Sequence, residues 1–244
     1  KKKKTLNLKN FKYYTSIKEA LRDADFVQEC ASENYTLKTK LMNTIGKYTK
    51  HNAIISSSSS GLLPTRIYSK CKNPERAMIG HPFNPVYMLP AVEIVPGKKT
   101  TKKYLNQANK FYKSISMNPI MVKHELPGYS SDRLQEALWR EGLHIISEGH
   151  ATTEDLDRAI EDGPGLRWSL MGTFLTFHLA GGKNGMRHML EQFGPALKLP
   201  WTKLKAPKLS NELINRLVKG TKKQSKGKSV TKISNIRDEY LVEL

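Results

Sequence analysis

The sequence predicts an α/β fold: a parallel sheet wrapped by helices in the N-terminal half, followed by an all-α C-terminal domain. Two observations lead to this prediction. Before residue 128, short apolar runs that stop at small or polar residues alternate with helical stretches, as strands alternate with crossover helices. After Gly128 the apolar spacing is helical, and no convincing strand pattern follows. We therefore expect a sheet domain at 1–127, a helical domain at 128–220 and a basic tail at 221–244.

The strands expected in the first domain are short apolar runs with polar residues at their ends. They are placed at 24–30, 52–56, 77–80, 91–95 and 117–122. Helices are expected where a capping residue precedes apolar side chains spaced about one turn apart. They are placed at 15–23, 32–47, 63–69 and 100–116. Because strands and helices alternate, we expect the strands to run parallel with right-handed connections.

The helical domain is predicted from apolar stripes and from glycine-containing breaks between them. Thr152 is a capping residue, and the Gly-Pro-Gly sequence at 163–165 ends the helix that it begins. The expected helices lie at 130–148, 152–163, 171–180, between 182 and 193, and at 211–219.

The helical domain is also rich in large apolar residues, more than a small lobe can bury by itself. We therefore expect a homodimer formed mainly by residues beyond Gly128. The apolar residues that support this expectation are Leu134, Leu138, Trp139, Leu143, Ile146, Met171 and Leu175.

The composition of the chain limits its function less than it limits its fold. The 244 residues include 41 Lys and Arg against 22 Asp and Glu, which gives a net charge of +19. Such a charge favours anionic ligands, nucleic acid or acidic surfaces, although lysines spread over solvated faces would give the same total. The chain opens on Lys1 rather than on Met, so we expect it to be a piece of something longer.

The cysteine pattern and the hydropathy limit the cellular compartments in which we expect the protein to work. Cys30 and Cys71 lack the spacing of metal ligands, so no metal site is predicted. Unpaired cysteines favour a reducing compartment, either the cytoplasm or, as an alternative, the mitochondrial matrix. No apolar run reaches the length of a membrane span.

Polar residues capable of catalysis gather at the predicted strand ends. His81 follows one strand, Asn84 lies three residues later, and Glu93 is a lone carboxylate within the next apolar run. A serine run that includes Ser60 follows the strand at 52–56. Histidine titrates near neutral pH and is a suitable general base for an alcohol proton, so His81 is our candidate base. Taken singly, each residue also has a structural interpretation, as a turn, a surface ion pair or a flexible loop.

Several motifs, in this order and spacing, resemble the L-3-hydroxyacyl-CoA dehydrogenase superfamily. In the first domain they are Ser-Ser-Ser-Gly-Leu at 58–62, Gly-His-Pro-Phe-Asn-Pro at 80–85, Val-Glu-Ile-Val at 92–95 and Pro-Gly-Tyr-Ser-Ser-Asp-Arg-Leu at 127–134. The most specific ones lie in the helical domain, at 132–141, 163–168, 171–182 and 192–203. Within the family the motifs look most like the branch that oxidises L-carnitine. The resemblance implies a Rossmann-like sheet and NAD-dependent oxidation of a small-molecule 3-hydroxy acid to the 3-keto acid.

The resemblance also implies roles for individual residues. His81 would be the base, and Glu93 would orient and charge it. Ser60 would bond the substrate oxygen and approach the nicotinamide, with Asn84 on the nicotinamide side. Glu33 and Lys38 would lie along the cofactor site.

The position of Asp132 departs from the general family pattern, which has Asn there, and this makes a CoA thioester a less suitable substrate. A small zwitterion would need a carboxylate clamp and an aromatic site for a quaternary ammonium group. Candidates for the clamp are Arg133, Arg167 and Arg187, and those for the aromatic site are Tyr129, Trp168, Phe174 and Phe177. The structural alternative for these aromatic residues is ordinary helix core.

The Gly-x-Gly-x-x-Gly turn with which this family begins does not occur in the sequence. We therefore expect an N-terminally incomplete sheet, and we expect residues 1–244 alone neither to bind NAD measurably nor to oxidise the substrate. Two alternatives stay open. The first is a 3-hydroxyacyl-CoA or L-gulonate dehydrogenase. The second is a dehydrogenase fold recruited as a structural or RNA-associated subunit of a larger assembly.

Overall fold

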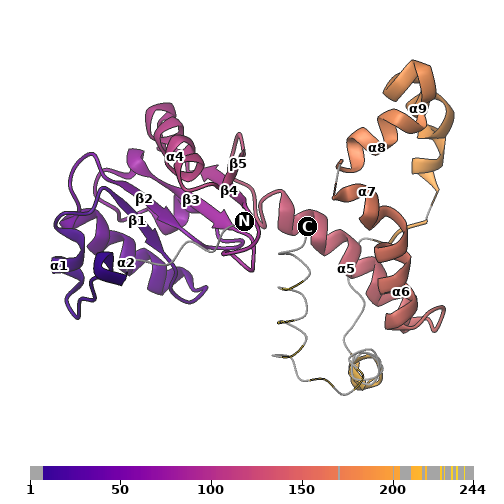
Figure 1. Cartoon of the computed structure of the whole chain (residues 1–244), viewed down its shortest axis with the longest axis horizontal. Coiled ribbons are helices and arrows are strands. Elements are labelled where there is room, and N and C mark those ends of the chain that lie inside the picture. Colours follow the sequence, from indigo (N-terminus) through magenta and orange to yellow (C-terminus); the bar gives the residue numbers. More distant parts are fainter. Residues whose placement is uncertain are drawn as a thin grey trace. The chain divides into compact units, whose positions relative to one another are not determined.

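The computed structural model describes residues 8–169, 171–199, 201–203 and 210–215, and the single positions 218, 226, 228, 232, 235 and 239. The chain divides into two compact units, Lys1–Arg133 and Leu134–Leu244 (Figure 1). The helix expected at 211–219 is described only at 211–215 and 218, which are helical. The basic tail expected at 221–244 lies outside the described residues except at single positions.

The first unit alternates strands and helices, as the sequence pattern predicts. The strands are β1 (Phe26–Glu29), β2 (Ile54–Ser57), β3 (Ala77–Pro82), β4 (Ala91–Pro96) and β5 (Asn118–Met121). The helices are α1 (Ile17–Leu21), α2 (Tyr35–Tyr48), α3 (Pro64–Ile67) and α4 (Lys102–Ser114). Side chains cap the first two helices where the sequence supplies an acceptor: Ser16 accepts from the Glu19 N–H, and Asn34 accepts from the Leu37 N–H.

The strands form one sheet in the order β1-β2-β3-β4-β5. Strands β1, β2 and β3 are parallel, and so are β4 and β5, but β3 and β4 are antiparallel. The expectation of an all-parallel sheet is therefore wrong at this pair. The connection between β3 and β4 is residues 83–90, shorter than the roughly twelve residues that a parallel crossover requires.

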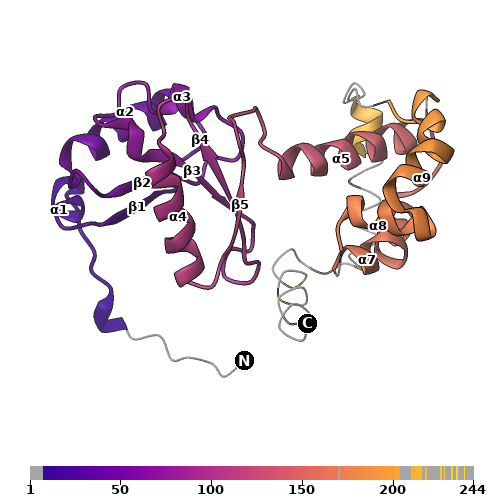
Figure 2. The ribbon, with the colours of Figure 1, turned by 90° about the horizontal axis from the view of Figure 1, so that it is seen from above.

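Helices cover both faces of the sheet, α2 and α3 on one side and α4 on the other (Figure 2). Alternation along the strands assigns the side chains to these faces. Ile55, Ile79 and Val95 pack in a core with α2 and α3 residues. Ile54, Met78, Val92 and Ile94 pack in a second core against Ala108 and Tyr112 of α4. Glu29, Ser57, His81 and Glu93 therefore share the α2 and α3 face.

A substitution at Gly80 tests the packing of α4 on the sheet. A Cβ at Gly80 would collide with the hydroxyls of Ser56 and Tyr112, which are buried and hydrogen bonded to each other at 2.9 Å. We expect Gly80→Ala to lower the free energy of unfolding by about 1–3 kcal/mol, the usual cost of overpacking. Urea denaturation is the measurement. Gly61→Ala is the matched control, because its Cβ would meet its nearest neighbours at 3.7 Å, and an equal loss in both variants would contradict the argument.

In the described residues after Met121, every regular element is helical. These elements are α5 (Ser131–Ser147), α6 (Thr153–Ile160), a π-helical turn (Glu161–Gly165), α7 (Leu166–Trp168), α8 (Thr173–Ala180) and α9 (Gly185–Phe193), with short 3-10 turns at Gly182–Asn184 and Gly194–Lys198. Thr152 and Asp155 form a reciprocal capping box at the start of α6. The backbone angles of Gly163 are not helical (φ −102°, ψ −111°), so the helix that begins after Thr152 is interrupted within Gly163–Gly165, where the sequence predicted its end. No helix in the described part of the chain is long and apolar enough to cross a membrane.

Candidate active site

His81 and Glu93 meet across the antiparallel pair that the sequence did not predict. They are opposite each other in the register of β3 and β4, and His81 Nδ1 lies 3.4 Å from Glu93 Oε2. Glu93 is fully buried, and His81 is 8% exposed. His81 lies near the carboxyl end of β3, at the same edge of the sheet as the carboxyl ends of β1 and β2. That edge is where open α/β sheets bind ligands.

The second carboxylate oxygen of Glu93 is held by the start of α5. Glu93 Oε1 accepts hydrogen bonds from the Ser130 N–H at 3.1 Å, from the Ser131 N–H at 3.2 Å and from the Ser130 hydroxyl. Burial by itself would raise the pKa of Glu93, but the hydrogen bonds from His81, Ser130 and Ser131 outweigh it and lower that pKa to about 2. Glu93 is therefore a carboxylate at neutral pH and only accepts. His81 Nδ1 must then carry the proton, which leaves the lone pair on Nε2.

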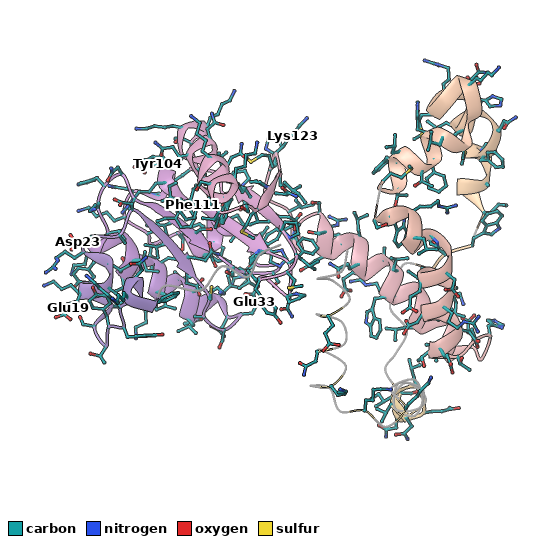
Figure 3. All side chains as sticks on the ribbon, in the orientation of Figure 1. Glu19, Asp23, Glu33, Tyr104, Phe111 and Lys123 are labelled. Atoms are coloured by element: carbon teal, nitrogen blue, oxygen red, sulfur yellow. The ribbon has the colours of Figure 1, made fainter. Side chains whose placement is uncertain are left out.

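The turn after β2, residues Ser59 to Gly61, is held by Glu33. Glu33 Oε1 accepts from the Ser59 hydroxyl at 2.6 Å, the Ser60 N–H at 3.0 Å and the Gly61 N–H at 3.2 Å. Burial raises the pKa of Glu33, and the Ser59 hydroxyl, the two N–H groups and the charge of Lys38 together bring it below its ordinary value. Ser60 itself is exposed at this edge. Figure 3 shows Glu33 on the opposite side of the sheet from Tyr104 and Phe111 of α4.

Lys38 lies in the interior rather than at the protein surface. Its side chain is 1% exposed, and its Nζ lies 3.0 Å from Glu29 Oε1, 2.8 Å from the Ala31 carbonyl oxygen and 3.6 Å from Glu33 Oε2. With these acceptors around it, Nζ contacts the Glu33 carboxylate from the interior of the first unit.

Tyr129 links the serine turn to the histidine. Its side chain is fully buried, its hydroxyl donates to the Leu62 carbonyl at 2.7 Å, and its ring lies edge-on to the His81 imidazole with centroids 5.8 Å apart. The preceding Gly128 donates its N–H to the Gly61 carbonyl at 3.3 Å and has a φ of 69°. Glycine adopts this left-handed conformation without steric cost. The sequence presented Tyr129 as a candidate for an ammonium site, whereas the structure buries it as packing for His81.

The other residues named from the sequence lie on several elements. Asn84 is exposed in the loop after β3, and Asp132 and Arg133 are in the first turn of α5. The remaining candidates belong to the second unit, where Arg167 and Trp168 are on α7, Phe174 and Phe177 on α8 and Arg187 on α9. Phe174 is 81% exposed, which differs from the helix-core alternative.

Sequence reasoning missed four polar residues of this site: Glu29, Ser59, Ser130 and Ser131. Glu29 lies at the end of an apolar run, as His81 does, so the same signal could have found it. Ser130 and Ser131 stand in a motif named above but contact a carboxylate 37 and 38 residues away, which no local pattern indicates. In the described residues, no group of three or more His, Cys, Asp or Glu side chains is placed to hold a metal ion.

A mixed α/β sheet with a buried His–carboxylate pair at its ligand-binding edge, followed by a helical domain, is the organisation of a nicotinamide-dependent dehydrogenase. The NAD binding domain of 3-hydroxyacyl-CoA dehydrogenase matches residues 1–125, and the C-terminal domain of the same enzyme matches residues 128–229. The chain belongs to the 3-hydroxyacyl-CoA dehydrogenase family.

Similar proteins with curated names are bacterial L-carnitine dehydrogenases. The one from Bacillus cereus is 54% identical over 226 residues, covering 93% of this chain and 69% of that protein. The one from Oceanobacillus iheyensis is 51% identical over 232 residues, covering 95% and 76%.

Solved structures show the same fold. The NAD+-dependent FHMPC 5-dehydrogenase, a dismutase, matches with a TM-score of 0.77 at 23% identity, over 93% of this chain and 74% of that one. The 3-hydroxybutyryl-CoA dehydrogenase of Escherichia coli matches with a TM-score of 0.62 at 26% identity, over 87% and 43%.

Proposed function

We propose that the protein oxidises the 3-hydroxyl of L-carnitine with NAD as cofactor and forms 3-dehydrocarnitine. The observation that carries the proposal is the His81–Glu93 pair, a buried ionised carboxylate that fixes the tautomer of a histidine at the ligand-binding edge. The relatives from Bacillus and Oceanobacillus, at 54% and 51% identity, support carnitine over other 3-hydroxy acids.

The residues at this edge fit the nicotinamide half of the cofactor. The carboxamide of nicotinamide needs a hydrogen-bond donor and an acceptor. The exposed Asn84 side-chain amide offers both, and so does the exposed Ser60 hydroxyl. Glu33 and, behind it, Lys38 shape the turn that carries Ser60. When bound, NAD supplies the hydride acceptor for the carbon that bears the hydroxyl.

In the proposed reaction His81 accepts the hydroxyl proton at Nε2. The imidazolium that forms is stabilised by Glu93, which stays ionised because its Oε1 is already held by Ser130 and Ser131. Ser60 would donate to the substrate oxygen and so keep the hydroxyl oriented toward His81. We further propose that Asp132, Arg133, Arg167, Trp168 and Phe174 contact the substrate, the arginines at its carboxylate and the aromatic rings at its quaternary ammonium group.

The direct test uses the protein that carries residues 1–244 with NAD+ and L-carnitine at neutral to alkaline pH. The formation of NADH is measured by its absorbance. We expect turnover with L-carnitine and at least about tenfold lower kcat/KM with D-carnitine, 3-hydroxybutyryl-CoA and L-gulonate, since a tenfold ratio needs only one lost contact. If 3-hydroxybutyryl-CoA or L-gulonate is turned over faster than L-carnitine, that compound is the substrate instead of carnitine. No turnover of any of them would favour the recruited-subunit alternative.

We also propose that the protein is a homodimer that works in the cytoplasm. The second unit exposes large apolar side chains, among them Leu134, Trp139, Phe174 and Leu179, each more than half exposed. Exposed apolar groups of this size commonly mark an interface between proteins. Sedimentation at micromolar concentration should give twice the monomer mass, and a monomer would contradict the proposal. The bacterial origin of the relatives named above supports the cytoplasm over the mitochondrial matrix.

A further inference from the structure

Glu29 is a buried carboxylate that the proposed reaction does not use. It ends β1 and is 6% exposed. Glu29 accepts from Lys38 Nζ at 3.0 and 3.1 Å, from the Ser57 hydroxyl and from the Ala31 N–H. Leaving one partner of such an ion pair buried and alone is strongly destabilising, so the pair stays closed in the folded protein.

One route leads from Glu29 to the serine turn through charges. Glu29 and the Ala31 carbonyl fix the position of the Lys38 ammonium, and Glu33 Oε2 faces that ammonium at 3.6 Å. With Oε2 turned toward Lys38, Glu33 directs Oε1 to the Ser60 and Gly61 N–H groups. The position of the turn therefore depends on a buried cation that Glu29 holds in place.

A second route runs through hydroxyl groups. The Ser57 hydroxyl donates to Glu29 Oε2 and accepts from the Ser59 N–H at 3.2 Å. The Ser59 hydroxyl in turn accepts from the Leu62 N–H at 3.2 Å while it donates to Glu33. Both routes begin at Glu29 and end on the same turn.

We propose that Glu29 is a positioning residue, which through Lys38 and Glu33 and through Ser57 holds the turn Ser59 to Gly61 in place and so sets Ser60 at the sheet edge that carries His81. The inference rests on the proposed function only in taking Ser60 as a substrate contact. Glu29 touches neither substrate nor cofactor in this scheme.

The test is hydrogen exchange of individual amides by NMR, on residues 1–244 without ligand. Glu29→Gln keeps the size of the side chain and removes its charge. We expect the Ser60 and Gly61 amides, which donate to Glu33, to exchange at least about tenfold faster than in the unchanged chain, the ratio expected when one hydrogen bond is lost. Asp25→Asn is the matched control, because it removes an exposed ion pair with Lys50 at the start of the same strand, and it should leave both amides unchanged.

Two further variants keep the test decisive if Glu29→Gln does not fold. The double variant Glu29→Gln with Lys38→Met removes both buried charges together, leaves no unpaired ion, and should give the same faster exchange. Ser57→Ala removes only the hydroxyl route and should speed exchange mainly at the Ser59 amide. The proposal is overturned if the Ser60 and Gly61 amides exchange at an unchanged rate in a folded variant that lacks the Glu29 charge.

Steady-state kinetics of the protein that carries residues 1–244 distinguish the positioning role of Glu29 from the proposed function. Glu29→Gln should lower kcat for the 3-hydroxy acid about tenfold, as misplaced positioning groups do, and Asp25→Asn should not. Faster amide exchange without any carnitine turnover in the unchanged protein would leave the positioning role standing and would reject the proposed function. Faster exchange with an unchanged kcat would overturn the link between the turn and Ser60 catalysis.

Discussion

In the complete protein that carries residues 1–244, replacing His81 by alanine is expected to lower kcat by about 10²- to 10⁴-fold, the contribution of a positioned general base. The substrate hydroxyl must lose its proton as the carbon loses hydride, and no other imidazole is paired with a buried carboxylate in the described part of the chain. NAD affinity should change by less than about threefold, since a base acts on the reacting proton rather than on cofactor binding. Steady-state kinetics and calorimetry with NAD measure the two quantities separately.

The control for this substitution is His51→Ala. His51 is exposed, and its Nδ1 lies 2.8 Å from the side-chain nitrogen of Asn73, so its removal should leave kcat unchanged. A His81→Ala protein with near-normal turnover would remove His81 from the mechanism. Loss of NAD binding together with turnover would instead assign it to the cofactor site.

Replacing Glu93 by glutamine is expected to reduce stability as well as turnover. The pKa of Glu93 is about 2 in the folded protein against an ordinary value of 4.5, which corresponds to about 3 kcal/mol of folding free energy at neutral pH. Because the folded-state pKa is the lower one, this contribution is complete above about pH 4.5 and is lost as the pH falls toward 2. The amide cannot accept from His81 and from the start of α5 as a carboxylate does, so kcat should also fall, by less than in His81→Ala.

Urea denaturation at pH 6 and at pH 3 measures the effect. The difference in free energy of unfolding between the unchanged chain and Glu93→Gln should shrink at pH 3, because part of the Glu93 contribution has gone there. Glu19→Gln, at an exposed carboxylate in the first turn of α1, should stay within about 0.5 kcal/mol of the unchanged chain at both values. A difference between Glu93→Gln and the unchanged chain that does not depend on pH would show that Glu93 is not held as a buried carboxylate.

Much of the secondary structure was open to prediction because its signals are local. Each strand of the first unit lies within or beside a predicted apolar run, and α2, α4 and α5 coincide with predicted amphipathic stretches to within a few residues. Capping residues such as Asn34 and Thr152 act on backbone groups three residues away, so a short window of sequence contains both partners.

The direction of β4 was not predicted, although the length of its connection contained the information. A short apolar run indicates a buried strand but not the direction of its neighbour, and the alternation of strands with helices suggested crossovers throughout. Residues 83–90 are too few for a crossover, so the chain turns back and brings Glu93 directly opposite His81. The pairing of these two residues is thus a consequence of a loop length rather than of a motif.

The sequence by itself determined which residues were candidates for the chemistry, because His81 and Ser60 follow the ends of apolar runs, which parallel strands bring to one edge, and Glu93 is a lone carboxylate within another run. Only the tertiary structure decided how those residues are held. The contacts of Glu93 with Ser130 and of Glu29 with Lys38 and Ser57 join segments whose separation along the chain follows no periodicity. They depend on burial, which makes an unpaired carboxylate so costly that its partners must come from whichever segments pack beside it.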